Sequence, residues 1–207
     1  MAQFLITQVY SFNLNQEQLA SKAVKALNML LINFKKLPLK PKTLCQLFDA
    51  FVGSILGYAS EIWGYSKSKE IEPIHLKFCK RILHVKLSCN NASVYDELGR
   101  YPLYVSRYVR MVKYWCKIQN SENILINHLY NESLKLCNKG CNFCYVQCKK
   151  MLIEYGFLYV FDEHFEGYQT TIFFKQIVID VYIQEWHGCL ERNQVLLSCK
   201  HCKTNFN

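Results

Sequence analysis

The sequence predicts an all-α protein, with a helical bundle followed by a smaller, mostly helical module. Apolar residues recur at helical spacing over several long stretches, and proline, glycine and capping residues stand where these stretches begin and end. The chain has 207 residues, of which 51% are hydrophobic. It is therefore long enough to bury a substantial core, in one large domain or in two small ones.

The first two helices are expected at residues 15–36 and 41–59. In the first, leucines and alanines repeat every three or four residues, and the segment LPLKP follows it. Pro41 suits the first turn of the second helix, because a backbone N–H is not needed there. Gly53 and Gly57 lower the helix propensity of this second stretch, but they would allow another helix to come close.

The third helix is expected in IHLKFCKRILHVK, residues 74–86, with Pro73 near its start. At 100° per residue, its apolar and basic side chains fall on different faces. The apolar face carries Ile74, Phe78 and Ile82, and the basic face carries Lys77, Lys80, Arg81 and His84. Such a basic face either binds an anionic partner or is only solvated.

A short helix closed by Gly99 and a longer helix from Pro102 to about Gln119 are expected next. The longer helix again has an apolar and a basic side. The apolar side contains Val105, Tyr108, Val109, Val112, Trp115 and Cys116, and the basic side contains Arg107, Arg110, Lys113 and Lys117. Tyr114 lies among these cations, and a ring beside cations can contact bases while the cations contact phosphates. The repeated pattern favours nucleic-acid contact over a solvated face.

Charge divides the chain into two predicted domains, residues 1–120 and residues 121–207. The first holds 17 Lys and Arg against 7 Asp and Glu, a net charge of +10, and the second holds 8 against 9, a net charge of −1. A concentrated positive field is typical of proteins that bind a polyanion, either nucleic acid or an anionic membrane surface. Solubility is the alternative explanation of this charge.

The second domain is expected to be a smaller, near-neutral helical module. Helices are predicted at residues 144–155 and from Thr170 or Thr171 to about His187, with an extended or looped piece between them. The region from 120 to 138 gives no clear pattern.

The eleven cysteines favour buried, reduced thiols over a disulfide framework. Four of them follow the spacing C-x3-C-x2-C-x3-C: Cys137, Cys141, Cys144 and Cys148. On one continuous helix the outer two thiols would lie about 16 Å apart, too far to share one zinc ion. Cys199 and Cys202 form a lone C-x2-C pair, which supplies half a zinc site only if another pair approaches. We therefore predict no metal site.

No catalytic signature is present in the sequence. There is no H-E-x-x-H pair, no local nucleophile signature and no glycine-rich phosphate loop. His75 lies toward an apolar helix face and fits a core histidine. We predict no enzyme activity and no cofactor.

Nothing in the sequence indicates membrane insertion or secretion. No apolar run reaches the ~18 residues that a spanning helix needs, and the start MAQFLITQVYSFNLN lacks the features of a signal peptide. We expect a soluble intracellular protein, nuclear or cytoplasmic, without a membrane partner.

Three segments stand in a distinctive order: LFDAFVGSILGYASEIWG, HLKFCKRIL and ELGRYPL. As a set they resemble the thumb, and the linker beyond it, of reverse transcriptases from non-LTR, LINE-type retrotransposons. The match runs from about Ala20 to Gln119, and more loosely to about residue 188. It implies a helical thumb whose cations contact the backbone of a template-primer duplex. The paired palm aspartates of that family are absent, so we expect a non-catalytic remnant with a truncated C-terminus.

We predict that seven exposed cations contact phosphates: Lys77, Lys80, Arg81, Arg107, Arg110, Lys113 and Lys117. We expect six apolar residues to hold the helices together: Phe48, Phe51, Ile82, Val109, Val112 and Trp115. Two alternatives stay open. One is a protein-interaction domain with an exposed apolar surface and no nucleic-acid partner, and the other is a zinc-dependent module built on the cysteines.

Overall fold

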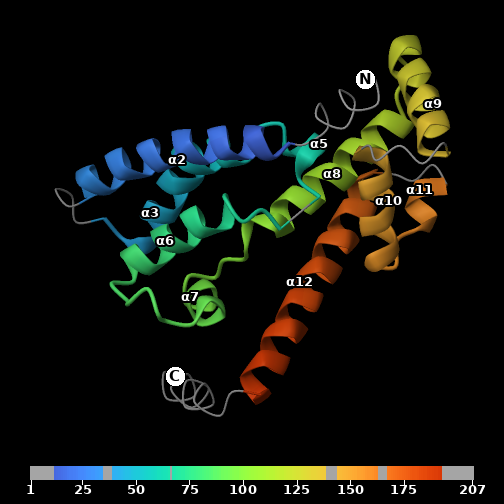
Figure 1. Cartoon of the computed structure of the whole chain (residues 1–207). Coiled ribbons are helices and arrows are strands. Elements are labelled where there is room, and N and C mark those ends of the chain that lie inside the picture. The colour runs from blue at the N-terminus through green and yellow to red at the C-terminus, as the bar shows by residue number, and fades with distance from the viewer. Residues whose placement is uncertain (1–11, 35–38, 66, 139–143, 163–166, 193–207) are drawn as a thin grey trace, which may run out of the picture.

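The computed structural model describes residues 12–34, 39–65, 67–138, 144–162 and 167–192, which form helices joined by turns and loops (Figure 1). These described ranges contain no strand, and the predicted all-α class is confirmed. The elements are α2 (Asn13–Phe34), α3 (Pro41–Phe48), the π-helix η1 (Asp49–Gly53), α4 (Ser54–Leu56), α5 (Ser60–Trp63), α6 (Glu72–Ile82), α7 (Asn91–Glu97), α8 (Leu103–Gln119), α9 (Ile124–Asn138), α10 (Cys144–Glu154), α11 (Tyr159–Asp162) and α12 (Gly167–Arg192).

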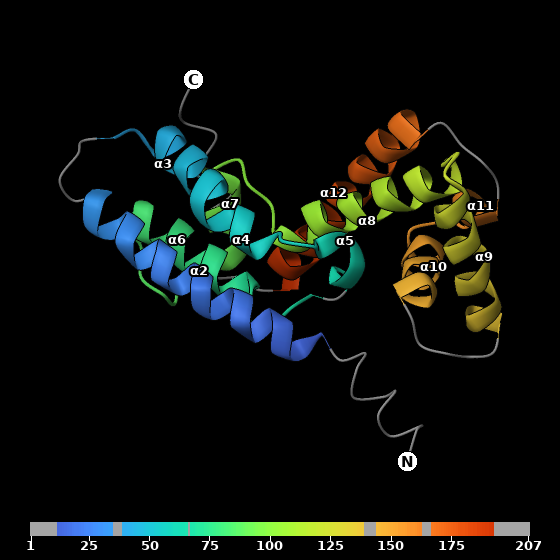
Figure 2. The same ribbon diagram turned by 90° about the horizontal axis from the view of Figure 1, so that it is seen from above.

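A first hydrophobic core is enclosed by α2, the segment from α3 to α5, α6 and α7. Leu27 of α2, Phe48 of α3, Trp63 of α5 and Phe78 of α6 are almost completely buried in it. Both Figure 1 and Figure 2 show α2, α3 and α6 together at one end of the molecule. Burial of these large side chains is the main force that holds this end together.

A second core is built by α8, α10, α11 and α12. Val112 of α8, Leu152 of α10, Val160 of α11 and Phe174 of α12 are completely buried in it. α8 packs along α12 and also contacts α5 and α6 (Figure 1), so this one helix joins the two cores. The two cores thus group α8 with the C-terminal helices, while the domain boundary at residue 120 stays a prediction.

The second predicted helix does not run without interruption from 41 to 59. It changes to π-helical hydrogen bonding in η1, ends at Leu56, and leaves Ala59 in the left-handed region at φ 52°. A π-helical turn holds one extra residue and rotates the following side chains relative to an α-helix. Phe51, inside η1, is 59% exposed, and the prediction that it holds the helices together is wrong.

The other five predicted packing residues are buried to different degrees. Phe48, Val112 and Trp115 are buried, and Ile82 and Val109 are partly buried against the two cores. α8 matches its predicted bounds to within a residue, and α7 ends shortly before Gly99 as predicted, whereas α6 begins two residues before and ends four residues before its predicted bounds of 74 and 86.

Helix α9 was not predicted. Asn123 caps its start, since its Oδ1 accepts hydrogen bonds from the backbone N–H groups of Leu125 at 2.9 Å and Ile126 at 3.3 Å. Its apolar residues are mostly exposed, which is why no core-facing stripe marks it in the sequence. The extended or looped piece predicted before α12 contains instead the short helix α11.

The cysteine stripe does not lie on one continuous helix, and that prediction is wrong. α9 ends at Asn138 and α10 begins at Cys144, so Cys137 and Cys148 belong to different helices. Cys148 is buried in the second core. Cys141, Cys199 and Cys202 lie outside the described residues. In the part of the chain that the structure describes, no cluster of three or more His, Cys, Asp or Glu could hold a metal ion.

No helix in the described part of the chain combines the length and the apolar character needed to cross a membrane.

Candidate nucleic-acid interface

One side of α8 carries three exposed cations, Arg110, Lys113 and Lys117, which we call the α8 stripe. At 100° per residue these side chains leave the helix within about 60° of one another, and at 1.5 Å per residue they span about 10 Å of its axis. The sequence of α8 contains no Asp or Glu. Among the described residues, these three cations form no ion pair. The α8 stripe is therefore an uncompensated positive surface.

The α8 stripe faces solvent because the opposite side of the helix is held in the second core. Val112 and Trp115 are buried there, and the Trp115 ring packs edge-on against Tyr145 of α10 with centroids 4.5 Å apart. Tyr114 stands next to the stripe and is 40% exposed. An exposed ring beside cations can stack on a base while the cations contact phosphates, as predicted for this residue.

Arg107, predicted to lie on the same basic surface, is buried, with only 2% of its side chain exposed. Its Nη2 donates a hydrogen bond of 2.8 Å to Oε1 of Glu72, and its guanidinium lies over the Trp63 ring. Burial lowers the pKa of Arg107 from its ordinary value, and the Glu72 carboxylate opposes this by favouring the charged form. Arg107 joins α5, α6 and α8, so the prediction that it lies exposed on the basic face of α8 is wrong.

The reason for this burial lies in the segment that faces α8. Gly64, directly after α5, has no side chain, and a Cβ built there would lie 3.0 Å from the Cβ of Arg107. α5 and α8 therefore approach closely at this point. Helical spacing alone places Arg107 beside Arg110. The first core covers the edge of the predicted basic face that carries Arg107, and it leaves the edge that carries Arg110 open to solvent.

Lys80 of α6 is also buried, with 4% exposed. Its Nζ donates a hydrogen bond of 2.5 Å to the backbone oxygen of Leu87, which holds the loop after α6 against the helix. A buried ammonium in this position satisfies a carbonyl of the same chain. The prediction that Lys80 is exposed on the basic face of α6 is therefore also wrong.

Lys77 and Arg81 are exposed as predicted, but they lie apart from the α8 stripe. They line a hollow of about 600 Å³ between α2 and the loop after α6, together with Leu31 and Ile32. None of the residues lining this hollow lies on α8. The expected single basic surface is thus divided into two separate groups of cations.

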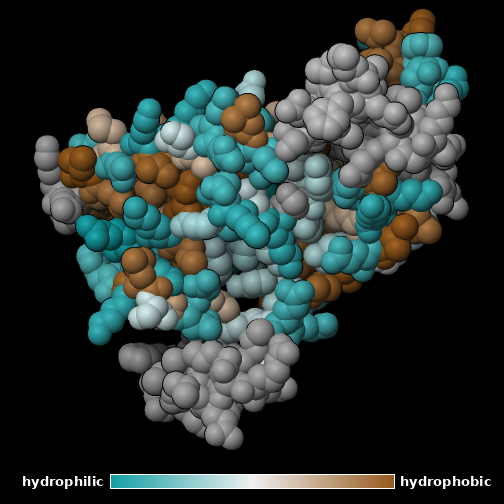
Figure 3. All heavy atoms as spheres, in the orientation of Figure 1, coloured by the Kyte–Doolittle hydropathy of each residue, from teal (hydrophilic) through white to brown (hydrophobic). Residues whose placement is uncertain are grey.

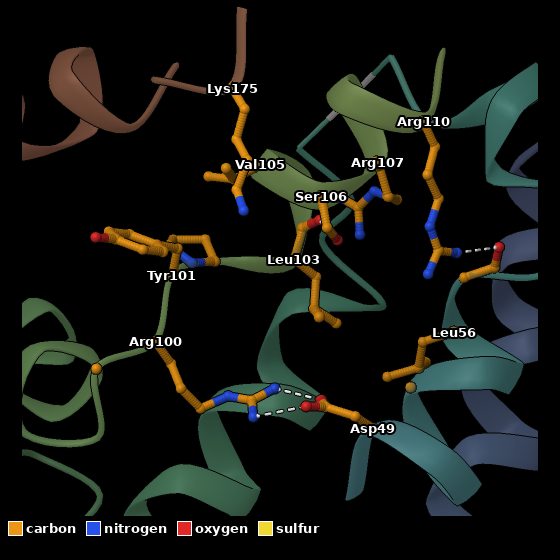
Figure 4. Close-up of a pocket in the computed structure, with 14 residues that line it drawn as sticks. Asp49, Leu56, Arg100, Tyr101, Leu103, Val105, Ser106, Arg107, Arg110 and Lys175 are labelled. Atoms are coloured by element: carbon orange, nitrogen blue, oxygen red, sulfur yellow. Dashed lines mark hydrogen bonds and ion pairs between the residues drawn. The ribbon is translucent and has the colours of Figure 1, made fainter. Parts of the chain in front are cut away.

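A pocket of about 380 Å³ lies at the N-terminal end of the α8 stripe (Figure 4). Residues from η1, α4, the connection between α7 and α8, α8 itself and α12 line it. Its cationic side chains are Arg100, Arg107, Arg110 and Lys175. Among the described residues that line it, Asp49 is the acidic one. Arg110 belongs to both the pocket and the stripe, so the two form one continuous basic region.

Arg100 is held in this pocket by two partners. Its Nη1 and Nη2 donate hydrogen bonds to the two carboxylate oxygens of Asp49, at 3.1 and 2.5 Å, and its Nε donates to Nε2 of His75 at 2.8 Å. His75 is completely buried and its ring stacks on Phe48. Burial and the neighbouring Arg100 lower the pKa of His75 to about 3, so the ring is neutral, in agreement with the predicted core histidine.

The sequence patterns did not indicate Arg100 or Lys175 as site residues. Arg100 lies in the short connection between α7 and α8, and Lys175 lies on α12, about 65 residues beyond Arg110 in the chain. Neither belongs to a basic helix face, and only the packing of α12 along α8 brings Lys175 to the pocket.

No family model, no curated protein and no solved structure matches this chain. The likeness to a reverse transcriptase thumb therefore stays a prediction from the three quoted segments.

Proposed function

We propose that this chain is a non-catalytic helical module that binds the phosphate backbone of nucleic acid, in the manner expected of a retroelement thumb and linker. The α8 stripe is the main contact in this proposal. The observation that supports it best is the run of exposed Arg110, Lys113 and Lys117 on a helix without acidic residues. Uncompensated cations in a row attract a polyanion more strongly than isolated ion pairs do.

The proposal predicts binding without base recognition. Contacts to phosphate oxygens fix the position of the protein on the duplex but carry no sequence information. Lys77 and Arg81 form a second, separate group of exposed cations and contribute less in this proposal, since nothing places them beside the stripe. The absence of an adjacent aspartate pair from the sequence supports the non-catalytic part.

The test is the salt dependence of duplex binding. With three or four phosphate contacts, log K should fall against log salt with a slope of about −2.7 to −3.6 on B-DNA, at −0.9 per contact. The triple variant Arg110→Glu, Lys113→Glu, Lys117→Glu should weaken binding to all sequences about equally and flatten this slope. Fluorescence anisotropy with two duplexes of unrelated sequence at several salt concentrations measures both effects.

A matched control removes the same charge elsewhere. Lys22, Lys25 and Lys42 are exposed on α2 and α3, and their reversal to Glu changes the net charge by the same amount. The control variant should keep most of the affinity, because its cations lie on other helices. Equal losses in both variants would show that binding responds to net charge alone, and an unchanged slope in the stripe variant would contradict the proposal.

A protein-interaction function is the second candidate, and the first half of α9 favours it. Ile124, Leu125 and Leu129 are 86%, 66% and 57% exposed there, and Figure 3 shows apolar side chains at this end of the molecule. An exposed apolar patch of this kind marks many protein contacts. Light scattering of the wild type and of an Ile124→Ser, Leu125→Ser variant would show whether the patch mediates self-association.

A further inference from the structure

The pocket at the end of the α8 stripe is built differently from the stripe itself. Figure 4 shows Arg100, Arg110 and Lys175 entering it from three separate parts of the chain. Its volume of about 380 Å³ lies within the range of about 300–1,000 Å³ that is typical of small-ligand sites. The stripe presents cations along a line, whereas the pocket surrounds a limited space with them.

The charges of the pocket leave an excess of two cations. Asp49 neutralises Arg100 through two hydrogen bonds, and Glu72 neutralises Arg107. Arg110 and Lys175 form no ion pair within the described residues. The hydroxyl of Ser106 also lines the pocket, but it donates its hydrogen bond to the backbone oxygen of Leu103 at 2.8 Å, so the two cations are the donors that face a ligand.

Arg110 is oriented before any ligand arrives. Its Nη1 donates a hydrogen bond of 2.9 Å to the backbone oxygen of Gly57, and its guanidinium occupies the space that a side chain at Gly57 would need. A Cβ at that position would lie only 2.2 Å from Nη1. Its remaining N–H groups can therefore bind an anion with a smaller loss of side-chain freedom than an unrestrained arginine would suffer.

The two unpaired cations favour a phosphate group with more negative charge over one with less. A phosphodiester inside a strand carries one negative charge, whereas a phosphomonoester carries about −1.5 to −2 near pH 7. Two unpaired cations on the walls of one concave space match the second group, which also exposes three oxygens to hydrogen-bond donors. A strand that follows the α8 stripe toward Ser106 would end at this pocket.

We propose that the pocket lined by Arg110 and Lys175 binds a phosphomonoester dianion, either the terminal phosphate of a nucleic acid strand or a free nucleotide. For the strand end, the proposal rests on the proposed backbone-binding function, because Arg110 serves both sites. For the free nucleotide it stands alone.

The experiment compares short duplexes that differ only at one end, which carries a 5′-phosphate, a 3′-phosphate or a hydroxyl. At least one phosphorylated end should bind about tenfold more tightly than the hydroxyl end, since charge-assisted hydrogen bonds to two cations are gained. Arg110→Gln and Lys175→Gln should each remove most of this preference. Lys113→Gln, a matched loss of one stripe cation outside the pocket, should weaken all ends equally and keep the preference.

A second variant tests whether the end preference depends on the position of the Arg110 guanidinium as well as on its charge. Gly57→Ala keeps every cation but displaces the Arg110 guanidinium, so binding of the phosphorylated end should fall by more than binding of the hydroxyl-ended duplex does. Circular dichroism of each variant checks that the helices are retained. Titration with 5′-AMP and with inorganic phosphate, at matched ionic strength, tests the free ligand.

Each outcome decides between the two proposals. Equal binding of all three ends, together with no saturable binding of 5′-AMP or phosphate, would overturn the pocket while the stripe-dependent backbone function stands. Saturable binding of 5′-AMP that needs Arg110 and Lys175, without any duplex binding, would support the pocket and refute the backbone function. A preference that survives in both the Arg110→Gln and the Lys175→Gln variant would place the terminal phosphate elsewhere and overturn the inference.

Discussion

The two basic helices, α6 and α8, look alike in sequence but use their cations differently. In α6, Lys80 is buried against the following loop, and Lys77 and Arg81 border a hollow beside α2. In α8, Arg107 is buried against Glu72 and Trp63, and the cations that remain form a stripe open to solvent. Each helix therefore has one cation whose side chain is buried. The neighbours of a helix, more than its own pattern, decide which cation is structural.

The largest expected effect is on stability and concerns the buried cation of α8. Arg107→Met should lower the free energy of unfolding by about 3 kcal/mol, because it leaves the carboxylate of Glu72 largely buried without its partner. Arg110→Met, three residues further along the helix, should change it by less than about 0.5 kcal/mol, since that side chain is exposed. Urea unfolding of both variants measures the difference. Similar effects of the two substitutions would show that Arg107 is not structural.

The next effect is a loss of stability at acid pH that comes from a histidine inside the first core. The pKa of His75 is about 3 in the folded protein and about 6.5 in the unfolded chain, so the unfolded chain binds the extra proton between these values. Stability should therefore be complete above pH 6.5 and should fall as pH decreases, by about 2 kcal/mol between pH 6.5 and 5. The charged groups nearest this ring are Arg100 and, through it, Asp49.

Urea unfolding at several pH values measures this dependence, and His75→Phe is the comparison. The variant keeps a ring that can stack on Phe48 but has no group that titrates in this range. It should be less stable at neutral pH, because Arg100 loses an acceptor, yet its stability should depend much less on pH between 6.5 and 5. An unchanged slope would mean that another group is responsible.

The smallest effect tests the buried cation of α6. Lys80→Met should lower the free energy of unfolding by about 1 kcal/mol, because the backbone oxygen of Leu87 loses its donor. Lys77→Met on the same helix should have almost no effect on stability. If Lys80→Met is neutral in urea unfolding, the Nζ contact with Leu87 contributes nothing to stability, and Lys80 would again be a candidate phosphate contact.

Much of the fold could be predicted from local patterns. Pro102 and the periodic apolar residues define α8, and Asn90 and Gly99 frame α7 through capping and a left-handed residue at φ 61°. These signals act within one or two turns of the chain, so a single sequence displays them. α9 was missed because its first half buries little, and burial produces the periodicity by which a helix is recognised.

The candidate site was predicted only in part, since it depends on distant contacts. Arg110, Lys113 and Lys117 lie on the exposed side of α8 as expected, but an angular plot treats Arg107 as equivalent to them. Only the close approach at Gly64 distinguishes Arg107. Lys175 reaches the pocket through the packing of two helices that no local pattern relates.

The π-helix η1 sets the orientation of Asp49 relative to Gly57, and deleting one residue from it would change that orientation. Asp49, which holds Arg100, is the first residue of the wide turn, and Gly57, which holds Arg110, follows the turn. Because a π-turn contains one residue more than an α-turn, removing a single exposed residue such as Ala50 would restore an ordinary helix. Every later residue would then rotate by about 100° relative to Asp49. Asp49 and Gly57 hold Arg100 and Arg110 toward the same pocket only because this segment has one residue more than a regular helix. The function proposed for the pocket therefore depends on the length of the segment as much as on its composition.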